Sequence, residues 1–213
     1  MDADDVGEHA GLSDISRDSG DVARYYDDWA DSYDRTLAEW RYELPDRVAE
    51  QLASWLDPRS AVLDAGCGTG LTGRALRAAG FGTIDGIDVS PRSIEASAAH
   101  GAYRQLTEVD MQRTPFPLDA DRYDGLVCVG VLTYLPDTMA TLTEFARLVR
   151  PGGTVIVTQR TDLFDERRFP EHLAALAADG ALGEVTIGEP EPYLPGNAEF
   201  GEELLVRRIA YRV

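Results

Sequence analysis

VLDAGCGTG, residues 62–70, is the stretch that decides the fold of this chain of 213 residues. An apolar strand at 61–64 runs into Asp64, three alternating glycines follow, and a helix begins near residue 71. Glycine tolerates positive φ and lets the backbone approach a ligand closely. Doubly wound sheets bind ligands at the carboxyl ends of their strands, where this loop would lie. The stretch therefore predicts a ligand site rather than a simple tight turn.

Strands and helices alternate after this loop. The patterns predict strands at 61–64, 83–88, 102–108, 123–129 and 154–158, and helices at 71–79, 91–99 and 137–149. Alternation of this kind indicates a parallel sheet with helices on both faces. A helix at 167–179 follows, and then strands at 184–187 and 203–211 with no helix between them. We expect these last two strands to pair as an antiparallel hairpin at the edge of the sheet.

Three segments are predicted along the chain. Residues 1–20 are polar and acidic, which is typical of a disordered tail. Residues 21–57 form an N-terminal helical cap with helices at 21–36 and 45–55, the first rich in aromatic residues and with Asp21 as its expected N-cap. Residues 58–213 form one ligand-binding α/β domain, and nothing indicates a repeat or a second such domain.

The composition narrows the class of protein. The net charge is −18 and the sequence pI is about 4.4, which disfavours nucleic acid and anionic membrane surfaces as partners. No apolar run approaches ~20 residues and the N-terminus lacks signal-peptide features, so we expect a cytoplasmic protein. All 20 basic residues are arginine, which excludes lysine-based catalysis. Cys67 and Cys128 indicate neither a disulfide scaffold nor a zinc site, and no metal is expected.

The glycines also fit a second class of ligand. Gly68, Gly70 and Gly73 satisfy G-x-G-x-x-G, and Asp88 lies 20 residues after Gly68, as in a dinucleotide site. In that fingerprint the motif follows its strand directly, whereas Asp64 and two further residues intervene here. The order acid-x-G-x-G-x-G instead resembles motif I of the class I S-adenosylmethionine (SAM)-dependent methyltransferases.

The resemblance extends over about residues 60–160. GIDVS, 86–90, resembles the segment whose acid, here Asp88, takes both ribose hydroxyls. EVDMQ, 108–112, resembles the segment in which Asp110 and the backbone N–H of Met111 take the adenine. FPLDADRYDGLVCVGVLTYLPD, 116–137, and RLVRPGGTVIVT, 147–158, match the segments around the fourth and fifth strands.

This resemblance implies a Rossmann-like, doubly wound α/β fold with a seven-stranded sheet of order 3-2-1-4-5-7-6. It implies SAM as the cofactor and S-adenosylhomocysteine (SAH) as the product. The cofactor-binding residues that it implies are Asp64, Ala65, Gly66, Cys67, Gly68, Gly70, Asp88, Val89, Ser90, Asp110, Met111 and Val129.

The N-terminal segment YYDDWADSYDRTLAEWRYELP, 25–45, resembles the opening of the Williams–Beuren-region methyltransferase-like proteins and related small-molecule methyltransferases. The sheet does not need this segment, which precedes the first strand. We expect 21–36 to form a lid over the cofactor, with Tyr26 and Tyr33 facing it. Tyrosine can cover the sulfonium and give a hydroxyl to the methionine carboxylate. The alternative is a helix that simply packs on the sheet.

The acceptor side is less well defined. VGVL, 129–132, lacks the Asn/Asp-Pro-Pro-aromatic clamp that DNA and protein amide methyltransferases place after the fourth strand. Asp137 and Asp162 are candidates for metal-dependent chemistry, but Asp137 fits better as a helix N-cap. Tyr134 and Arg160 are candidate residues of the acceptor pocket, Arg160 for an acidic substrate. No catalytic residue is assigned.

Three functions fit these observations. A small-molecule O- or N-methyltransferase fits best. A protein or RNA methyltransferase is the second possibility, although the charge of −18 argues against RNA without a local arginine patch. A SAM-binding protein without turnover is the third. A small-molecule acceptor is therefore the expected partner, and whether the protein is a monomer or a dimer is left open.

Overall fold

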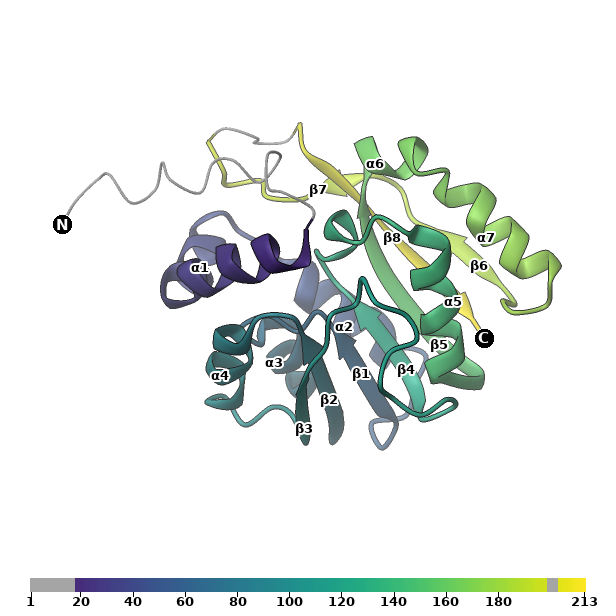
Figure 1. Cartoon of the computed structure of the whole chain (residues 1–213), viewed down its shortest axis with the longest axis horizontal. Coiled ribbons are helices and arrows are strands. Elements are labelled where there is room, and N and C mark those ends of the chain that lie inside the picture. Colours follow the sequence, from purple (N-terminus) through teal and green to yellow (C-terminus); the bar gives the residue numbers. More distant parts are fainter. Residues whose placement is uncertain (1–17, 199–202) are drawn as a thin grey trace.

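The computed structural model of the chain describes residues 18–198 and 203–213. Within them a central sheet has the strand order β3-β2-β1-β4-β5-β8-β6, with β7 paired to β8 (Figure 1). The strands are β1 (Ala61–Ala65), β2 (Thr83–Asp88), β3 (Gln105–Glu108), β4 (Tyr123–Cys128), β5 (Val149–Arg160), β6 (Val185–Ile187), β7 (Glu191–Pro192) and β8 (Leu205–Arg212). The helices are α1 (Ser19–Glu39), α2 (Leu44–Ala53), α3 (Leu71–Ala78), α4 (Pro91–Ala98), the 3-10 helix η1 (Leu132–Tyr134), α5 (Thr138–Leu148), α6 (Thr161–Glu166) and α7 (Phe169–Ala178).

The strand directions confirm the predicted Rossmann-like architecture. Strands β1 to β5 pair in parallel, β8 pairs antiparallel with β5, and β6 pairs antiparallel with β8. This is the expected order 3-2-1-4-5-7-6, with β8 in the place of the seventh strand. The chain adds β7 because two residues of the proline-rich loop also pair with β8.

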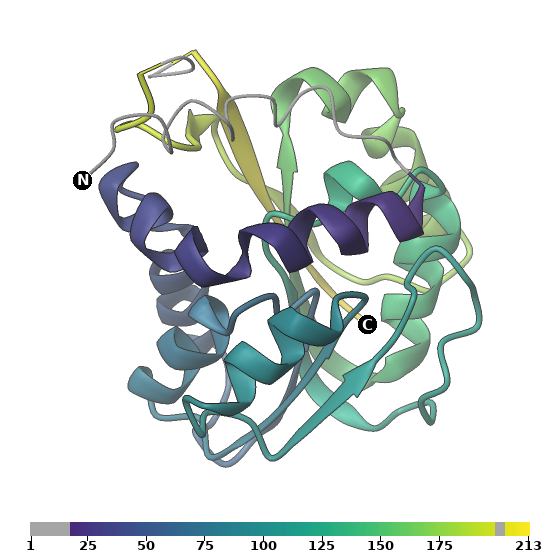
Figure 2. The same cartoon turned by 60° about the vertical axis from the view of Figure 1, so that its left-hand side comes forward.

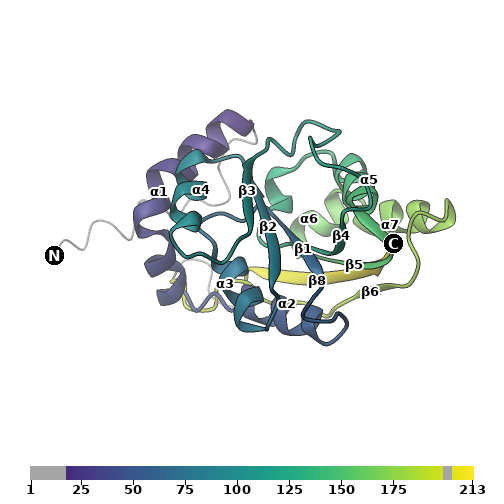
Figure 3. The same cartoon turned by 90° about the horizontal axis from the view of Figure 1, so that it is seen from below.

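Helices cover both faces of the sheet, as Figure 3 shows from below. Leu63 and Leu126 point into a core shared with α5 and α7. Val62 and Val127, which are their immediate sequence neighbours, point into a core shared with α2 and α3. Side chains alternate between the two faces of a strand, so burial on both faces requires the nearly continuous apolar runs of the central strands.

Several boundaries differ from the sequence-based predictions. The first helix begins at Ser19, not at 21, because Asp18 rather than Asp21 is its N-cap and accepts the N–H of Gly20 at 3.0 Å. Residues 18–20 thus belong to the helix and its cap, and the rest of the predicted tail lies outside the described residues. The second helix ends at Ala53, which leaves Trp55 beyond it and 39% exposed.

The third strand begins three residues later than predicted, at Gln105, and the fourth ends at Cys128, before Val129. The fifth strand spans Val149–Arg160 instead of 154–158, because Val149 pairs with β4 before a register shift and the last two residues pair with β8.

The predicted helix at 167–179 corresponds to α7, and the short helix α6 that precedes it was not predicted. Arg168 separates them, since its φ of 50° lies in the left-handed region and cannot continue a helix.

The N-terminal helix α1 lies outside the two cores of the sheet. It crosses in front of the sheet beside α4, and Figure 2 shows it in purple. Its buried residues Trp29 and Leu37 form a separate cluster with Trp40 and Leu194. No helix in the described part of the chain is long and apolar enough to cross a membrane.

Candidate functional site

The glycine loop between β1 and α3 leaves an open space at the carboxyl end of the sheet. Gly66, Gly68 and Gly70 have φ values of 83°, 51° and 99°, which favour glycine. A Cβ on Gly66 would lie 2.3 Å from the Val131 side chain, whereas a Cβ on Gly68 would meet nothing within 4 Å. Gly66 is therefore required by packing, and Gly68 faces a space that a ligand can fill.

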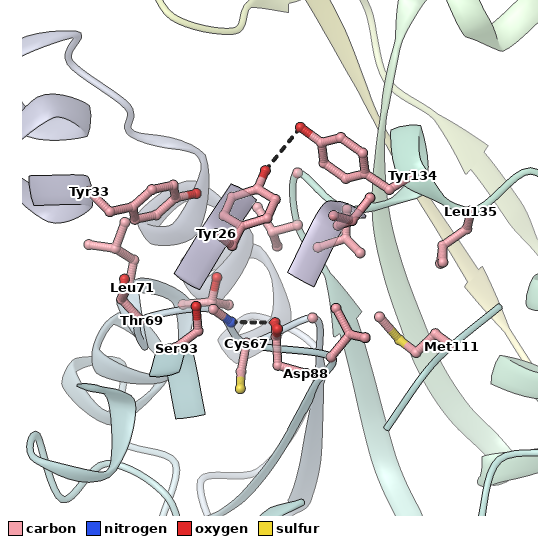
Figure 4. Close-up of a pocket in the computed structure, with 18 of the residues that line it drawn as sticks. Tyr26, Tyr33, Cys67, Thr69, Leu71, Asp88, Ser93, Met111, Tyr134 and Leu135 are labelled. Carbon is pink, nitrogen blue, oxygen red and sulfur yellow. Dashed lines mark hydrogen bonds between the residues drawn. The ribbon is translucent and has the colours of Figure 1, made fainter. Parts of the chain in front are cut away.

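A cleft of about 870 Å³, counting its open mouth, lies over this loop. Its lining is mostly apolar with a few polar groups, as in small-molecule and cofactor sites. Figure 4 shows Tyr33, Tyr26 and Tyr134 along one side of the cleft and Asp88 on the other. The predicted cofactor residues that line it are Tyr26, Tyr33, Gly66, Cys67, Gly68, Asp88, Val89, Asp110, Met111 and Val129.

Asp88 presents its carboxylate to the cleft. Its Oδ2 accepts the N–H of Gly68 at 2.8 Å, and its Oδ1 accepts the N–H of Ser90 at 2.9 Å (Figure 4 shows the first bond). Burial raises the pKa of Asp88, and these backbone donors act in the opposite direction. Because each carboxylate oxygen has two lone pairs, each can accept one further hydrogen bond. The group thus suits a ligand with two adjacent hydroxyls, as a ribose has.

The remaining predicted cofactor residues, Asp64, Ala65, Gly70 and Ser90, lie outside the cleft lining. Asp64 is fully buried and accepts the hydroxyl of Tyr103 at 2.7 Å. Burial raises the pKa of Asp64 to about 7. Ser90 is the N-cap of α4, and its Oγ accepts the N–H of Ser93 at 3.0 Å. These residues therefore stabilise the floor of the cleft from below.

Gly73, the third glycine of the dinucleotide-like pattern, has a packing role here. A Cβ at this position would lie 2.2 Å from the ring of Tyr103, and its N–H donates to the Tyr103 hydroxyl at 3.1 Å. Gly73 therefore makes room for the tyrosine that reaches Asp64. Sequence reasoning missed Tyr103, since nothing local to residue 103 signals this contact.

Polar contacts hold α1 over the cleft. Asp27 accepts the hydroxyl of Ser90 at 2.5 Å. Asp34 accepts the hydroxyl of Thr69 at 2.5 Å and pairs with Arg74 at 2.8 Å. These bonds connect α1 to the glycine loop, to α3 and to the start of α4, so the helix is seated directly on the elements that form the cleft.

A second cavity of about 390 Å³ adjoins the first. The two share the lining residues Tyr26, Tyr33, Tyr42, Gly130 and Tyr134. The Tyr26 hydroxyl donates to the Tyr134 hydroxyl at 2.9 Å, which links α1 to η1 (Figure 4). Arg160 lines the second cavity and not the first. Both candidate acceptor residues, Tyr134 and Arg160, thus meet in one place.

Two further tyrosines of the second cavity were not identified from the sequence. The rings of Tyr42 and Tyr193 pack edge-on with their centroids 5.5 Å apart, and burial raises the pKa of both hydroxyls. A Cβ at Gly130 would lie 2.8 Å from the Tyr42 hydroxyl and 3.0 Å from that of Tyr193. Only glycine at position 130 therefore leaves room for this pair. Tyr193 lies in a proline-rich loop whose sequence gives no indication of a site.

Arg167 fixes the segment that carries Tyr134. Its guanidinium donates to the carbonyls of Leu132 at 2.7 Å, Thr133 at 2.7 Å and Leu135 at 3.0 Å. Charge-assisted hydrogen bonds of this kind are stronger than neutral ones. Three of them, on carbonyls within η1 and at its C-cap, hold the ring of Tyr134 at the boundary of the two cavities.

The acids considered for metal chemistry have other partners. Asp137 is the N-cap of α5, as predicted, and accepts the N–H of Ala140 at 2.9 Å. Asp162 pairs with Arg160 at 2.7 Å. Across residues 18–198 and 203–213 no group of three or more His, Cys, Asp or Glu side chains could hold a metal ion.

Comparisons with known sequences support this reading of the cleft. A methyltransferase domain family matches residues 33–183. Human methyltransferase-like protein 27 is 35% identical over 141 residues, 65% of this chain and 57% of the relative. A ubiquinone biosynthesis O-methyltransferase of Alkalilimnicola ehrlichii is 33% identical over 102 residues, 45% of this chain and 39% of the relative. The chain thus spans less than two thirds of these relatives.

Solved structures show the same fold at low identity. A SAM-dependent methyltransferase of Thermotoga maritima, described as a possible histamine N-methyltransferase, has a TM-score of 0.63 and 17% identity, covering 89% of this chain and 98% of its own. A geranyl diphosphate C-methyltransferase of Streptomyces coelicolor, solved with SAH, has a TM-score of 0.64 and 15% identity. The match covers 91% of this chain and 97% of the Streptomyces coelicolor chain. With a cleft that fits the cofactor and a family match over most of its length, the chain belongs to the class I SAM-dependent methyltransferases.

Proposed function

We propose that this methyltransferase transfers the methyl group of SAM to an oxygen or nitrogen of a small molecule. The observation that carries the proposal is the second cavity of about 390 Å³, which adjoins the cofactor cleft beneath α1. A pocket that shares a wall with the cofactor cleft would hold a small acceptor beside the methyl group. The relatives named as ubiquinone biosynthesis O-methyltransferases act, by that name, on the oxygen of a small molecule, which favours the same class here.

The cofactor residues follow from the cleft. We propose that Asp88 accepts both ribose hydroxyls with the oxygen lone pairs left by its backbone partners. Asp110 and the N–H of Met111 would receive the adenine at the end of the cleft that they line. The open space at Gly68 would receive the methionine part, because a side chain there would fill it.

SAM supplies an electrophilic methyl group on a sulfonium that is already a good leaving group. The chain must hold the acceptor nucleophile in line with that methyl group and exclude water. Tyr26, Tyr33 and Tyr134 border both cavities, so their rings would form the wall at which the two ligands meet. Aromatic rings also attract a cationic centre such as a sulfonium.

We propose further that α1 is a lid. Its apolar residues Trp29 and Leu37 pack in their own cluster and not in either core of the sheet. Displacing the helix would thus leave both cores covered. The contacts that it would break are the polar ones to Ser90, Thr69 and Tyr134 and the apolar one to Leu194. A helix held in this way can open for ligand exchange without unfolding of the sheet.

Turnover with a panel of small oxygen and nitrogen nucleophiles, measured as release of SAH, tests this function. We expect at least one class to be methylated, and the same assay on short peptides and RNA oligomers to give no product. Methylation of a peptide or an RNA, with no small molecule accepted, would contradict the proposal.

A further inference from the structure

The second cavity contains hydrogen-bond donors without matching acceptors. The Tyr134 hydroxyl accepts a bond from Tyr26, and the ring of Tyr193 packs edge-on against that of Tyr42, with the ring centroids 5.5 Å apart. The Tyr134 and Tyr193 hydroxyls each have a proton of their own to donate. Among the described residues, neither proton has an acceptor in the cavity wall. Two phenol donors thus face the same small space.

Arg160 adds a cation to these donors. Its Nε and Nη2 bind Asp162 at 3.1 and 2.7 Å, and in the part of the chain that the structure describes its Nη1 donates to no acceptor. The Arg160 side chain is 14% exposed, while that of Asp162 is 53% exposed and lies toward solvent. Burial raises the pKa of both Tyr134 and Tyr193, and the positive charge of Arg160 acts in the opposite direction on both. All three residues line the second cavity, so the guanidinium lies near both hydroxyls.

The charges of the lining select one ligand class. Arg160 is the one charged residue in the described lining of the second cavity, and no Asp or Glu lines it, although the chain has a net charge of −18. Apart from Gly130 and Thr133, the rest of the wall is aromatic or apolar: Tyr26, Trp29, Tyr33, Leu37, Tyr42, Tyr134, Tyr193 and Leu194. An aromatic cage alone would suit an ammonium group. Here the positive charge of Arg160 would repel an ammonium group, because the described wall of the cavity contains no acid to balance that charge.

We propose that the methyl acceptor is a small aromatic or apolar molecule with a carboxylate, which Arg160, Tyr134 and Tyr193 bind in the second cavity. This inference rests on the proposed function, because it assigns the acceptor of the same site. Arginine with two neutral phenols forms a donor set that matches a carboxylate. Gly130 is part of this site, since it alone admits the hydroxyls of Tyr42 and Tyr193.

A carboxylate could also come from the methionine end of SAM. The lining argues against that source, because Tyr193 and Arg160 line the second cavity and are absent from the cofactor cleft. The two sources make different predictions. If the donors serve the acceptor, removing them leaves cofactor affinity unchanged.

Calorimetry on the SAH-loaded protein tests the inference with three matched probes: 4-hydroxybenzoate, its neutral amide and 4-hydroxybenzylamine. We expect the acid to bind most tightly. Arg160→Met and Tyr193→Phe should each raise the Kd of the acid by roughly tenfold or more, which corresponds to the loss of one charge-assisted hydrogen bond. Neither should change binding of the amide by more than about twofold. Arg59→Met, at a surface arginine whose side chain is 90% exposed, is the matched control and should change nothing.

Three results would overturn the inference. The acid could fail to bind, or bind no more tightly than the amide or the amine. Arg160→Met and Tyr193→Phe could bind the acid as the wild type does. Arg160→Met could weaken SAH itself, which would assign the donors to the cofactor. Failure of the wild type to bind SAH would instead contradict the proposed function.

Discussion

Replacing Gly68 by alanine separates the role of the glycine loop in binding from its role in folding. The added methyl group would meet no protein atom within 4 Å, so no clash with the fold is expected. The positive φ of 51° would cost about 1–2 kcal/mol in a residue with a Cβ. For a domain of this size that lowers Tm by roughly 2–8 °C. The hydrogen bond from residue 68 to Asp88 would remain, because alanine keeps its N–H.

Affinity for SAM should fall far more than stability. The methyl group would occupy space that the cofactor needs, which we expect to raise the Kd by roughly tenfold to a hundredfold, the result of losing about 1.4–3 kcal/mol. Gly101→Ala is a matched control: its φ is 63°, a Cβ there also meets nothing within 4 Å, and it lies outside the cleft. Melting curves and calorimetric titrations of both variants would make the comparison. If Gly68→Ala binds SAM as tightly as Gly101→Ala does, the loop does not hold the cofactor.

Three other perturbations test neighbouring parts of the account. Asp88→Ala should weaken SAM binding by at least about a hundredfold, since two charge-assisted hydrogen bonds at ~1.5–3 kcal/mol each are lost, and an unchanged Kd in calorimetry would refute its role. Burial raises the pKa of Asp64 from 3.8 to about 7, so between these values the folded state keeps a proton that the unfolded state loses. The free energy of unfolding should therefore fall as pH rises from about 4 to 7, by up to about 4 kcal/mol. Asp64→Asn should remove this slope in urea unfolding, and an identical slope in both proteins would contradict the assignment. SAM should slow hydrogen exchange of the amides of Ser19–Glu39 if α1 is a lid, whereas equal exchange with and without SAM would show that it is a fixed part of the core.

Local sequence patterns predicted most of the sheet. Buried parallel strands need continuous apolar runs, and the turns between them need glycine, proline or a capping residue, so both leave a strong local pattern. The acids at the strand ends, Asp88 and Asp110, were found for the same reason, because each follows a recognisable strand and lies in the cleft. The helix α7 was predicted, but α6 was missed, because a helix of six residues is too short to show a helical period.

The acceptor cavity was predicted only in part, because its residues meet through the fold. Tyr26 and Tyr134 are 108 residues apart and bond across the cleft. Tyr193 reaches the cavity from a proline-rich loop, and its partner Tyr42 comes from the segment before α2. Arg167 fixes η1 by binding carbonyl groups, which carry no side-chain signature. No period or spacing in the sequence encodes contacts of this kind.

The central claim is that the cleft over the glycine loop binds SAM, and calorimetric titration of the wild-type protein tests it most directly. We expect SAM and SAH to bind saturably at one site per chain, each displacing the other. NAD, the ligand of the dinucleotide-like glycine pattern, should give no saturable heat. Saturable binding of NAD, with none of SAM or SAH, would contradict the claim and would assign the cleft to a dinucleotide.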